Sequence, residues 1–198
     1  MIKDISEIIN NLLSFYDFSN KTIVSVGAGG GQFISYAKVA YHVIAIDNDK
    51  AALDRLNENI SNSGLTEKFT LIHSNFSDVN VKGDVVLFEF CLHEMENPQL
   101  MLQHAKAVAN NVIIADHGVN SQWAFIADET TKAENSWAQV LNNHIQKIVT
   151  HKAEQYFSSY NQLYEKVKVQ GMNSIDRIGK FKECSNIVIP MEYTFALI

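Results

Sequence analysis

The feature that most constrains the fold is an alternation of short apolar runs with helical patterns over the first 117 residues. Helical spacing of apolar residues precedes the first run, and helical patterns at 32–40, 49–63 and 98–109 separate later runs. The runs with the composition of buried strands are TIVSV (22–26), HVIAID (42–47), KFTLIHSN (68–75), DVVLFEF (84–90) and NVIIAD (111–116). Such alternation predicts an open, doubly wound α/β sheet that binds ligands at the carboxyl ends of its parallel strands.

The pattern changes after Asp116. Residues 118–157 carry no strand signal and have helical spacing, which predicts a helical cover segment over the ligand edge of the sheet. A further helix is expected at 159–170, followed by two strands, 176–183 and 186–198, joined by a turn. We therefore expect a single domain, residues 1–198, with a mostly parallel seven-stranded sheet and an antiparallel C-terminal hairpin.

Composition restricts the class of partner. The formal net charge is −6, and no dense cluster of Lys and Arg is present, which disfavours a nucleic-acid surface. No apolar run approaches the roughly 20 residues of a membrane span, and the N-terminus lacks the shape of a signal peptide. The two cysteines, Cys91 and Cys184, lie far apart without zinc-site spacing. We expect a cytoplasmic protein without a metal site, and the oligomeric state stays open.

The first strand ends in a glycine-rich stretch, IVSVGAGGG, at residues 23–31. Glycines that follow a strand and lead into a helix let backbone N–H groups approach a ligand. A dinucleotide fingerprint requires its third glycine at position 32, where this chain has Gln32. The spacing of Gly27, Gly29 and Gly31 instead leaves room for the amino-acid portion of a nucleoside ligand.

With this glycine phase and the terminal hairpin, the sequence resembles the class I S-adenosylmethionine-dependent methyltransferases. The resemblance covers residues 22 to about 117, and the hairpin corresponds to the antiparallel seventh strand of that family. It implies S-adenosylmethionine as cofactor, S-adenosylhomocysteine as product, and methyl transfer by direct in-line displacement.

The resemblance also implies where the cofactor binds. Asp47, at the end of the second strand, would accept hydrogen bonds from the ribose hydroxyls. Asn75 and Phe76 would contact adenine. The family usually has an acid where this chain has Ser25, and Glu89 is the candidate to supply that charge. The full set of predicted cofactor-binding residues is Gly27, Ala28, Gly29, Gly31, Asp47, Asn48, Asn75, Phe76 and Glu89.

Polar residues follow the fourth and fifth strands at the same predicted edge. His93 and His117 are candidate bases for a substrate proton, with Asp116 or Glu94 to orient them. The predicted catalytic residues are His93, His117 and Asp116. The predicted substrate contacts are His93, Glu94, Trp123 and Tyr160, although aromatic residues at helical spacing are more often core than binding surface.

The sequence thus predicts an enzyme that methylates a small-molecule acceptor. The accepting atom stays open. A non-catalytic S-adenosylmethionine-binding or regulatory subunit with the same fold is the alternative. A nicotinamide-dependent oxidoreductase comes third, because Gln32 breaks its fingerprint and the chain leaves no separate substrate domain.

Overall fold

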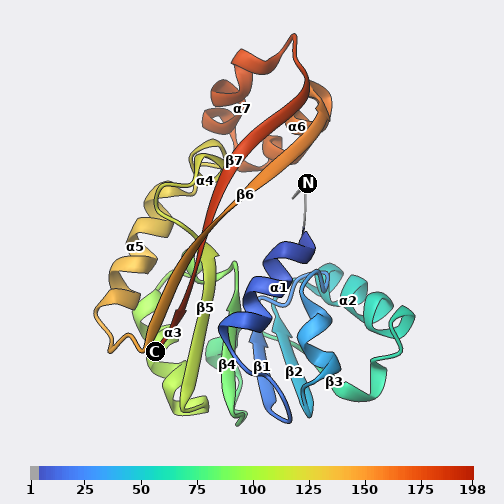
Figure 1. Ribbon diagram of the computed structural model, residues 1–198, viewed down its shortest axis with the longest axis vertical. Coiled ribbons are helices and arrows are strands. Elements are labelled where there is room, and N and C mark those ends of the chain that lie inside the picture. The colour runs from blue at the N-terminus through green and yellow to red at the C-terminus, as the bar shows by residue number, and fades with distance from the viewer. Residues whose placement is uncertain (1–4) are drawn as a thin grey trace.

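The computed structural model describes residues 5–198, which form one seven-stranded sheet in the order β3-β2-β1-β4-β5-β7-β6 (Figure 1). The first five strands are parallel, and β7 runs antiparallel to both β5 and β6. This confirms the predicted mixed sheet with an antiparallel C-terminal hairpin. The strands are β1 (Thr22–Val26), β2 (His42–Asp47), β3 (Phe69–His73), β4 (Val85–Glu89), β5 (Asn111–His117), β6 (Lys147–Ser159) and β7 (Ser185–Leu197).

Helices cover both faces of the sheet and create two apolar cores. One core takes Leu12 from α1 and Leu56 from α2, and the other takes Leu102 from α3 and Trp137 from α5. Strands β1, β4 and β5, which lie between these layers, are buried on both sides, which explains their continuous apolar composition. The α-helices are α1 (Ile5–Phe15), α2 (Lys50–Asn62), α3 (Pro98–Val108), α4 (Gln122–Ile126), α5 (Thr130–Leu141), α6 (Tyr160–Val167) and α7 (Met172–Ile178).

The ends of the helices follow local chemistry. The Asp49 side chain accepts a hydrogen bond from the Ala51 backbone N–H and so caps α2. Asn97 caps α3 in the same way through the Leu100 N–H, and Pro98 occupies the first turn. None of the helices within residues 5–198 is both long and apolar enough to span a membrane.

Three sequence-based expectations are wrong. Residues 147–157 belong to strand β6, so the helical part of the predicted cover segment ends at Leu141. Residues 176–183 form the end of α7 and a 3-10 turn instead of a strand. Residues 32–40 contain only a short 3-10 helix, Ile34–Lys38. The sequence signal of β6 is weak because it is a largely exposed edge strand, which forms through its pairing with β7 rather than through apolar burial.

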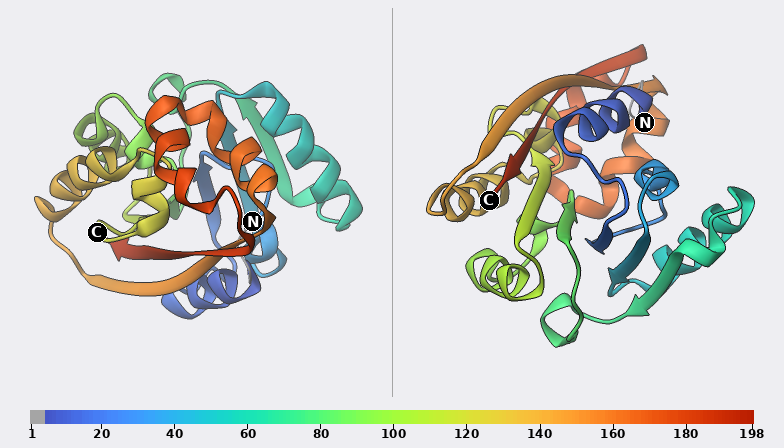
Figure 2. Two further views of the ribbon diagram at one scale, coloured as in Figure 1. Left: turned by 90° about the horizontal axis from the view of Figure 1, so that it is seen from above. Right: turned by 60° about the horizontal axis from the view of Figure 1, so that its bottom comes forward.

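The β6–β7 hairpin extends well beyond the rest of the sheet. In β7, strand β5 pairs with Tyr193–Leu197 alone, whereas β6 pairs along the whole of β7, back to Ser185. The extension carries α6 and α7, which lie above the carboxyl ends of the parallel strands (Figures 1 and 2). The element that covers the ligand edge is therefore this hairpin insertion, together with α4.

Candidate active site

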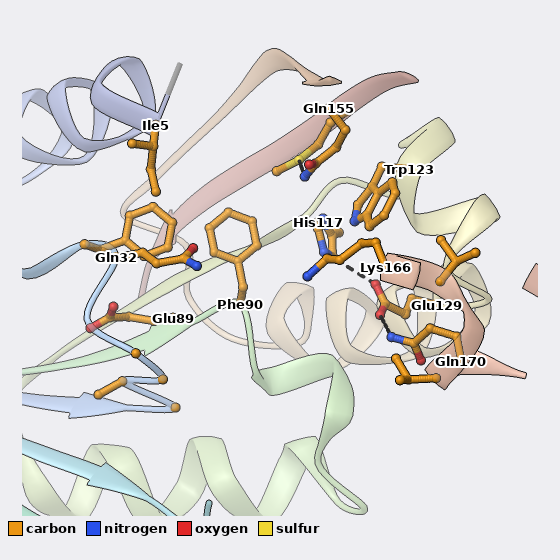
Figure 3. A pocket seen from close by; sticks show the side chains of 18 residues that line it. Ile5, Gln32, Glu89, Phe90, His117, Trp123, Glu129, Gln155, Lys166 and Gln170 are labelled. Atoms are coloured by element: carbon orange, nitrogen blue, oxygen red, sulfur yellow. Dashed lines mark hydrogen bonds and ion pairs between the residues drawn. The ribbon is translucent and has the colours of Figure 1, made fainter. Parts of the chain in front are cut away.

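Two cavities lie side by side at the carboxyl ends of the parallel strands. One, of about 750 Å³, is lined by Asp47 and residues after β3 and β4, and we call it the Asp47 cavity. The other, of about 670 Å³, reaches under α4 and α6 and is called the His117 cavity (Figure 3). Gly27, Glu89 and Phe90 line both cavities. A ligand that passes these three residues would occupy both cavities at once.

The glycines between the cavities have two different reasons to lack a side chain. A Cβ on Gly27 would lie 2.5 Å from the Cβ of Cys91, and one on Gly31 would lie 2.6 Å from Leu56 Cδ1. Gly29 has a φ of +54°, and a Cβ there would meet no other atom within 3.4 Å, its nearest neighbour being Gly27 O at 3.8 Å. Gly27 and Gly31 thus allow close packing, whereas Gly29 leaves open space in the His117 cavity.

The Asp47 cavity gathers predicted cofactor contacts from three strands. Asp47 accepts hydrogen bonds from the backbone N–H groups of Gly29 (2.8 Å) and Asp49 (2.9 Å), which fixes its carboxylate beside the glycine loop. Asn48 donates to the side-chain oxygen of Asn75 at 3.3 Å. Phe76 is buried against Phe88 and still forms part of the cavity wall. The structure brings these residues together, while Gly31 lines neither cavity.

Glu89 lies at the junction of the cavities and is held by two hydroxyl groups. Ser25 Oγ and Tyr36 Oη each donate to Glu89 Oε1 at 2.5 Å. Burial raises the pKa of this carboxyl to about 7, and the two donated hydrogen bonds limit the rise. Position 25 has Ser instead of an acid, and the carboxylate of Glu89 on the neighbouring strand β4 accepts a hydrogen bond from the Ser25 hydroxyl.

Phe90 follows Glu89 with a φ of +52°, a backbone conformation that costs energy for a residue with a side chain. Its N–H donates to the Ala115 carbonyl at 2.7 Å. Its ring stacks on Phe33, with the ring centroids 5.5 Å apart, and makes an edge contact with the His117 ring, with the centroids 5.2 Å apart. The strained turn therefore places an aromatic face at the passage between the cavities.

The His117 cavity has a mixed wall of polar and aromatic side chains (Figure 3). Trp123, a predicted substrate contact, lines it and stacks on Phe157. Tyr160 lines neither cavity among the described residues and packs beside Tyr164 instead. The polar side chains in the wall are Gln32, Glu89, His117, Glu129, Gln155, Lys166 and Gln170.

At the floor of this cavity the ends of β4 and β5 bring together the predicted catalytic residues. Asp116 Oδ1 lies 2.5 Å from His93 Nδ1, and its other oxygen accepts the His93 backbone N–H at 3.1 Å. Glu129 Oε2 lies 3.5 Å from His117 Nε2 and 3.8 Å from His93 Nε2. Residues 93, 117 and 129 are all buried, and the cluster they form with Asp116 is called the His–Glu cluster below.

Burial and neighbouring charges shift the pKa values in this cluster in opposite directions. Burial lowers the pKa of His93, but hydrogen bonding to Asp116 and Glu94 outweighs it and raises the value to about 10. Burial lowers the pKa of His117 to about 4 and raises that of Glu129 to about 7. Hydrogen bonding to His93 lowers the pKa of Glu94 to about 2. Such divergence within one cleft is typical of functional sites.

Sequence reasoning missed Glu129 entirely. It precedes α5, and no local motif marks it, because it reaches the cluster only through the packing of α5 against the loop after β4. Gln155 was missed because it lies on β6, which was predicted to be helical. Lys166 and Gln170 lie in the helical stretch predicted at 159–170, which the structure confirms, but no motif marked them as cavity residues. The one available signal for Glu129 was an acid within the predicted cover segment.

Comparisons with known proteins identify the type of domain and its fold. Residues 24–111 match the family model described as Methyltransferase domain. A search of curated protein sequences found no match. Many solved structures are similar at low sequence identity, which establishes the fold.

Three of these structures are informative. A provisionally named methyltransferase from Bacillus halodurans is 11% identical with a TM-score of 0.69, over 98% of this chain and 97% of that one. A provisionally named RNA methyltransferase from Pyrococcus horikoshii is 18% identical with a TM-score of 0.60, over 100% and 85%. Magnesium protoporphyrin IX methyltransferase from Synechocystis, with S-adenosylhomocysteine bound, is 10% identical with a TM-score of 0.60, over 97% and 80%.

Proposed function

We propose that this chain, which carries a methyltransferase domain in the class I S-adenosylmethionine-dependent methyltransferase fold, transfers a methyl group from S-adenosylmethionine to a small-molecule acceptor. The observation that carries the proposal is the pair of cavities that meet at Gly27, Glu89 and Phe90. One cavity suits the adenosine of the cofactor, and the other suits an acceptor facing its methyl group.

The cofactor would lie with its ribose at Asp47 and its adenine between Asn75 and Phe76. The carboxylate of Asp47 keeps free lone pairs beyond the two backbone bonds it accepts, so it can also accept from ribose hydroxyls. Glu89 is the acid nearest the glycine loop on the side of the His117 cavity, where the methionine ammonium would be. An ionised Glu89 there gives a charge-assisted hydrogen bond.

The reaction would be a direct displacement at the methyl carbon. The acceptor atom forms a bond to that carbon while the carbon–sulfur bond breaks and its electron pair stays on sulfur, giving S-adenosylhomocysteine. Holding the two reactants in line supplies much of the rate. An acceptor that carries a proton would release it to Glu129 or His117, the two members of the His–Glu cluster that line the cavity.

His93 and Asp116 would then act as positioning residues. Neither lines the His117 cavity, and the Nδ1 atom of His93 is occupied by Asp116. This departs from the initial expectation that His93 itself takes the substrate proton. Trp123 is the proposed aromatic contact of the acceptor, and Tyr160 is not.

A small-molecule acceptor fits better than RNA, although one similar structure is named an RNA methyltransferase. The chain has a formal net charge of −6, and the acceptor cavity lies beneath α4 and the hairpin insertion, which favours a compact substrate. The non-catalytic cofactor-binding subunit stays the alternative, and a cytoplasmic location stays part of the proposal.

The test is methyl transfer from labelled S-adenosylmethionine by the purified full chain. A panel of phenols, amines, thiols and carboxylic acids forms one arm, and total cellular RNA forms a second. The proposal predicts label in a small molecule and calorimetric binding of S-adenosylhomocysteine but not NAD. Label in RNA alone would overturn the acceptor class, and cofactor binding without any transfer would support the binding subunit.

A further inference from the structure

The His–Glu cluster has the geometry of a metal site. One ligand atom from each of His93, His117 and Glu129 lies within 4.8 Å of the other two. The separations of Glu129 Oε2 from the two Nε2 atoms are 3.5 and 3.8 Å. Ligands that bind one zinc ion tetrahedrally at about 2.0–2.1 Å are about 3.4 Å apart. The two separations from Glu129 are close to that value, and the two imidazole nitrogens, within 4.8 Å of each other, would need to reach it by side-chain shifts.

We propose that His93, His117 and Glu129 bind one divalent transition-metal ion at the floor of the His117 cavity. Two imidazoles and one carboxylate favour zinc or a neighbouring first-row ion over magnesium or calcium, which prefer oxygen ligands. The sequence predicted no metal site, because the three residues come from separate elements without a recognisable spacing.

Partners outside the set hold two of the three ligands in place. Asp116 Oδ1 engages His93 Nδ1, which directs the Nε2 atom of that ring toward Glu129. A carboxylate on the far nitrogen of a metal-binding histidine is a common device for orienting the ring. Gln170 Nε2 donates to the second oxygen of Glu129 at 3.1 Å and leaves Oε2 for the ion.

His117 is held differently. Its Nδ1 atom is buried and has no hydrogen-bond partner among the described residues. The ring is fixed instead by its edge contact with Phe90 and by its place at the end of β5, whose carbonyl at His117 accepts from Trp137 at 2.7 Å. Its Nε2 atom therefore faces Glu129 through packing and backbone position.

The site would keep an open coordination position. His117 and Glu129 line the acceptor cavity, whereas His93 lies behind them, so the free side of an ion would face the space for the acceptor. Glu94 Oε1, 3.4 Å from His93 Nε2, offers a further oxygen, although Lys132 holds its other oxygen at 2.7 Å. Resting on the proposed function, the open position would take an oxygen, nitrogen or sulfur donor of the acceptor and ease its loss of a proton, which would pass to water in place of the coordinated Glu129 and His117.

The alternative interpretation is a cluster without metal, in which a protonated His93 forms ion pairs with Asp116, Glu94 and Glu129. Metal binding distinguishes the two directly. The full chain, with Cys184→Ser to remove an exposed thiol, is stripped with chelator and titrated with Zn²⁺ by calorimetry. Co²⁺ is then added, and its visible d–d absorption reports the coordination geometry.

The variants separate this site from adventitious binding. Glu129→Gln keeps the shape of the side chain, and His117→Ala removes one imidazole. Each should weaken Zn²⁺ binding by more than about 100-fold, and Asp116→Asn by about 10–100-fold. His144→Ala, an exposed histidine between α5 and β6, is the matched control and should change nothing. Binding of S-adenosylhomocysteine to every variant verifies that it is folded.

The inference predicts one tight Zn²⁺ site and an intense Co²⁺ spectrum of low coordination number, both lost in Glu129→Gln. Absence of Zn²⁺ binding to the stripped protein, or binding that survives Glu129→Gln and His117→Ala, would overturn it. Methyl transfer that persists in chelator with no bound ion overturns this inference and leaves the proposed function standing. A bound ion without methyl transfer would leave this inference standing and overturn the proposed function.

Discussion

The two cavities differ in how the chain builds them. The walls of the Asp47 cavity come mainly from residues just after β1, β2, β3 and β4, each a few positions beyond a strand that the sequence marks clearly. The His117 cavity also uses the glycine loop and the ends of β4 and β5, but the rest of its wall comes mainly from α4, the residue before α5, β6, α6 and β7, which are separated by up to 70 residues of chain. The first cavity is set by strand-end chemistry, and the second by strand ends together with the later elements that pack around them.

This difference suggests a division of labour. The ends of parallel strands form a fixed frame, so a cofactor common to many methyltransferases can be held by short local motifs. The hairpin insertion and α4 can vary without changing that frame, and an acceptor-specific wall is suited to them. Substitutions in one cavity should therefore change cofactor affinity, and those in the other should change turnover.

The largest effect should come from Gly29→Val in the glycine loop. The φ of +54° is strained for a branched residue, and the new side chain would project into the open space that the ligand needs. Calorimetry should detect no binding of S-adenosylhomocysteine. Gly30→Ala is the control, because a Cβ there meets only the flexible Arg55 side chain at 3.5 Å. Equal affinity in both variants would remove the loop from the site.

Glu129→Gln should have the next largest effect, on turnover instead of cofactor binding. Turnover should fall by about 10²–10⁴-fold, the range for loss of a proton-transfer group, while S-adenosylhomocysteine affinity stays within about twofold. Glu134→Gln, an exposed glutamate on α5, serves as the control for a lost charge. A parallel loss of cofactor affinity in Glu129→Gln would erase the proposed division.

Asp47→Ala should weaken S-adenosylhomocysteine binding by roughly 10–150-fold, the equivalent of about 1.5–3 kcal/mol for hydrogen bonds to a charged group. Asp49→Ala is a close control, because Asp49 caps α2 instead of lining either cavity. It should lower the melting temperature and leave affinity unchanged. If Asp47→Ala also lowers the melting temperature and leaves affinity unchanged, Asp47 has a structural role only.

Glu89 predicts a pH dependence of cofactor affinity. Its pKa of about 7 means that the carboxylate, proposed to attract the cofactor ammonium, is lost as pH falls below 7. Affinity should drop by at most about tenfold per pH unit in that range, and Glu89→Gln should abolish the dependence. Tyr36→Phe, which removes one donor to this carboxylate, should move the midpoint upward.

The raised pKa of Glu89 also affects the stability of the unliganded protein, which should decrease as pH rises. Folding raises the pKa of Glu89 from its ordinary value of 4.5, so the folded state binds the additional proton between pH 4.5 and 7. The contribution of Glu89 to stability therefore decreases as pH rises through this window. Denaturant titrations of the wild-type protein and Glu89→Gln should converge at low pH and separate at high pH.

The smallest expected effect is one of protection from hydrogen exchange. Helices α6 and α7 lie on the part of the hairpin that extends beyond the sheet, so their amides should exchange faster than those of β1 and β4. Acceptor together with S-adenosylhomocysteine should slow exchange in α6, and cofactor alone should act mainly on the glycine loop. Uniform protection would make the insertion ordinary core.

The sequence predicted the sheet and the Asp47 cavity because both rest on local patterns. Strands β1, β4 and β5 are buried on both faces and form continuous apolar runs, and the glycine phase marks the loop after β1. Strand β6 lacks that signal, since most of its side chains are exposed and its partner β7 lies far along the chain. Glu129 reaches His117 through tertiary packing, and no spacing in the sequence encodes that contact.

The position of the transferable methyl group decides whether the cofactor passes from the Asp47 cavity toward the His117 cavity. S-adenosylmethionine labelled with ¹³C in its methyl group would be bound to the full chain and observed by NMR. The account predicts nuclear Overhauser contacts from the methyl to the rings of Phe90 and His117, at the passage into the acceptor cavity. Contacts to the Phe76 ring alone, deep in the Asp47 cavity, would contradict it.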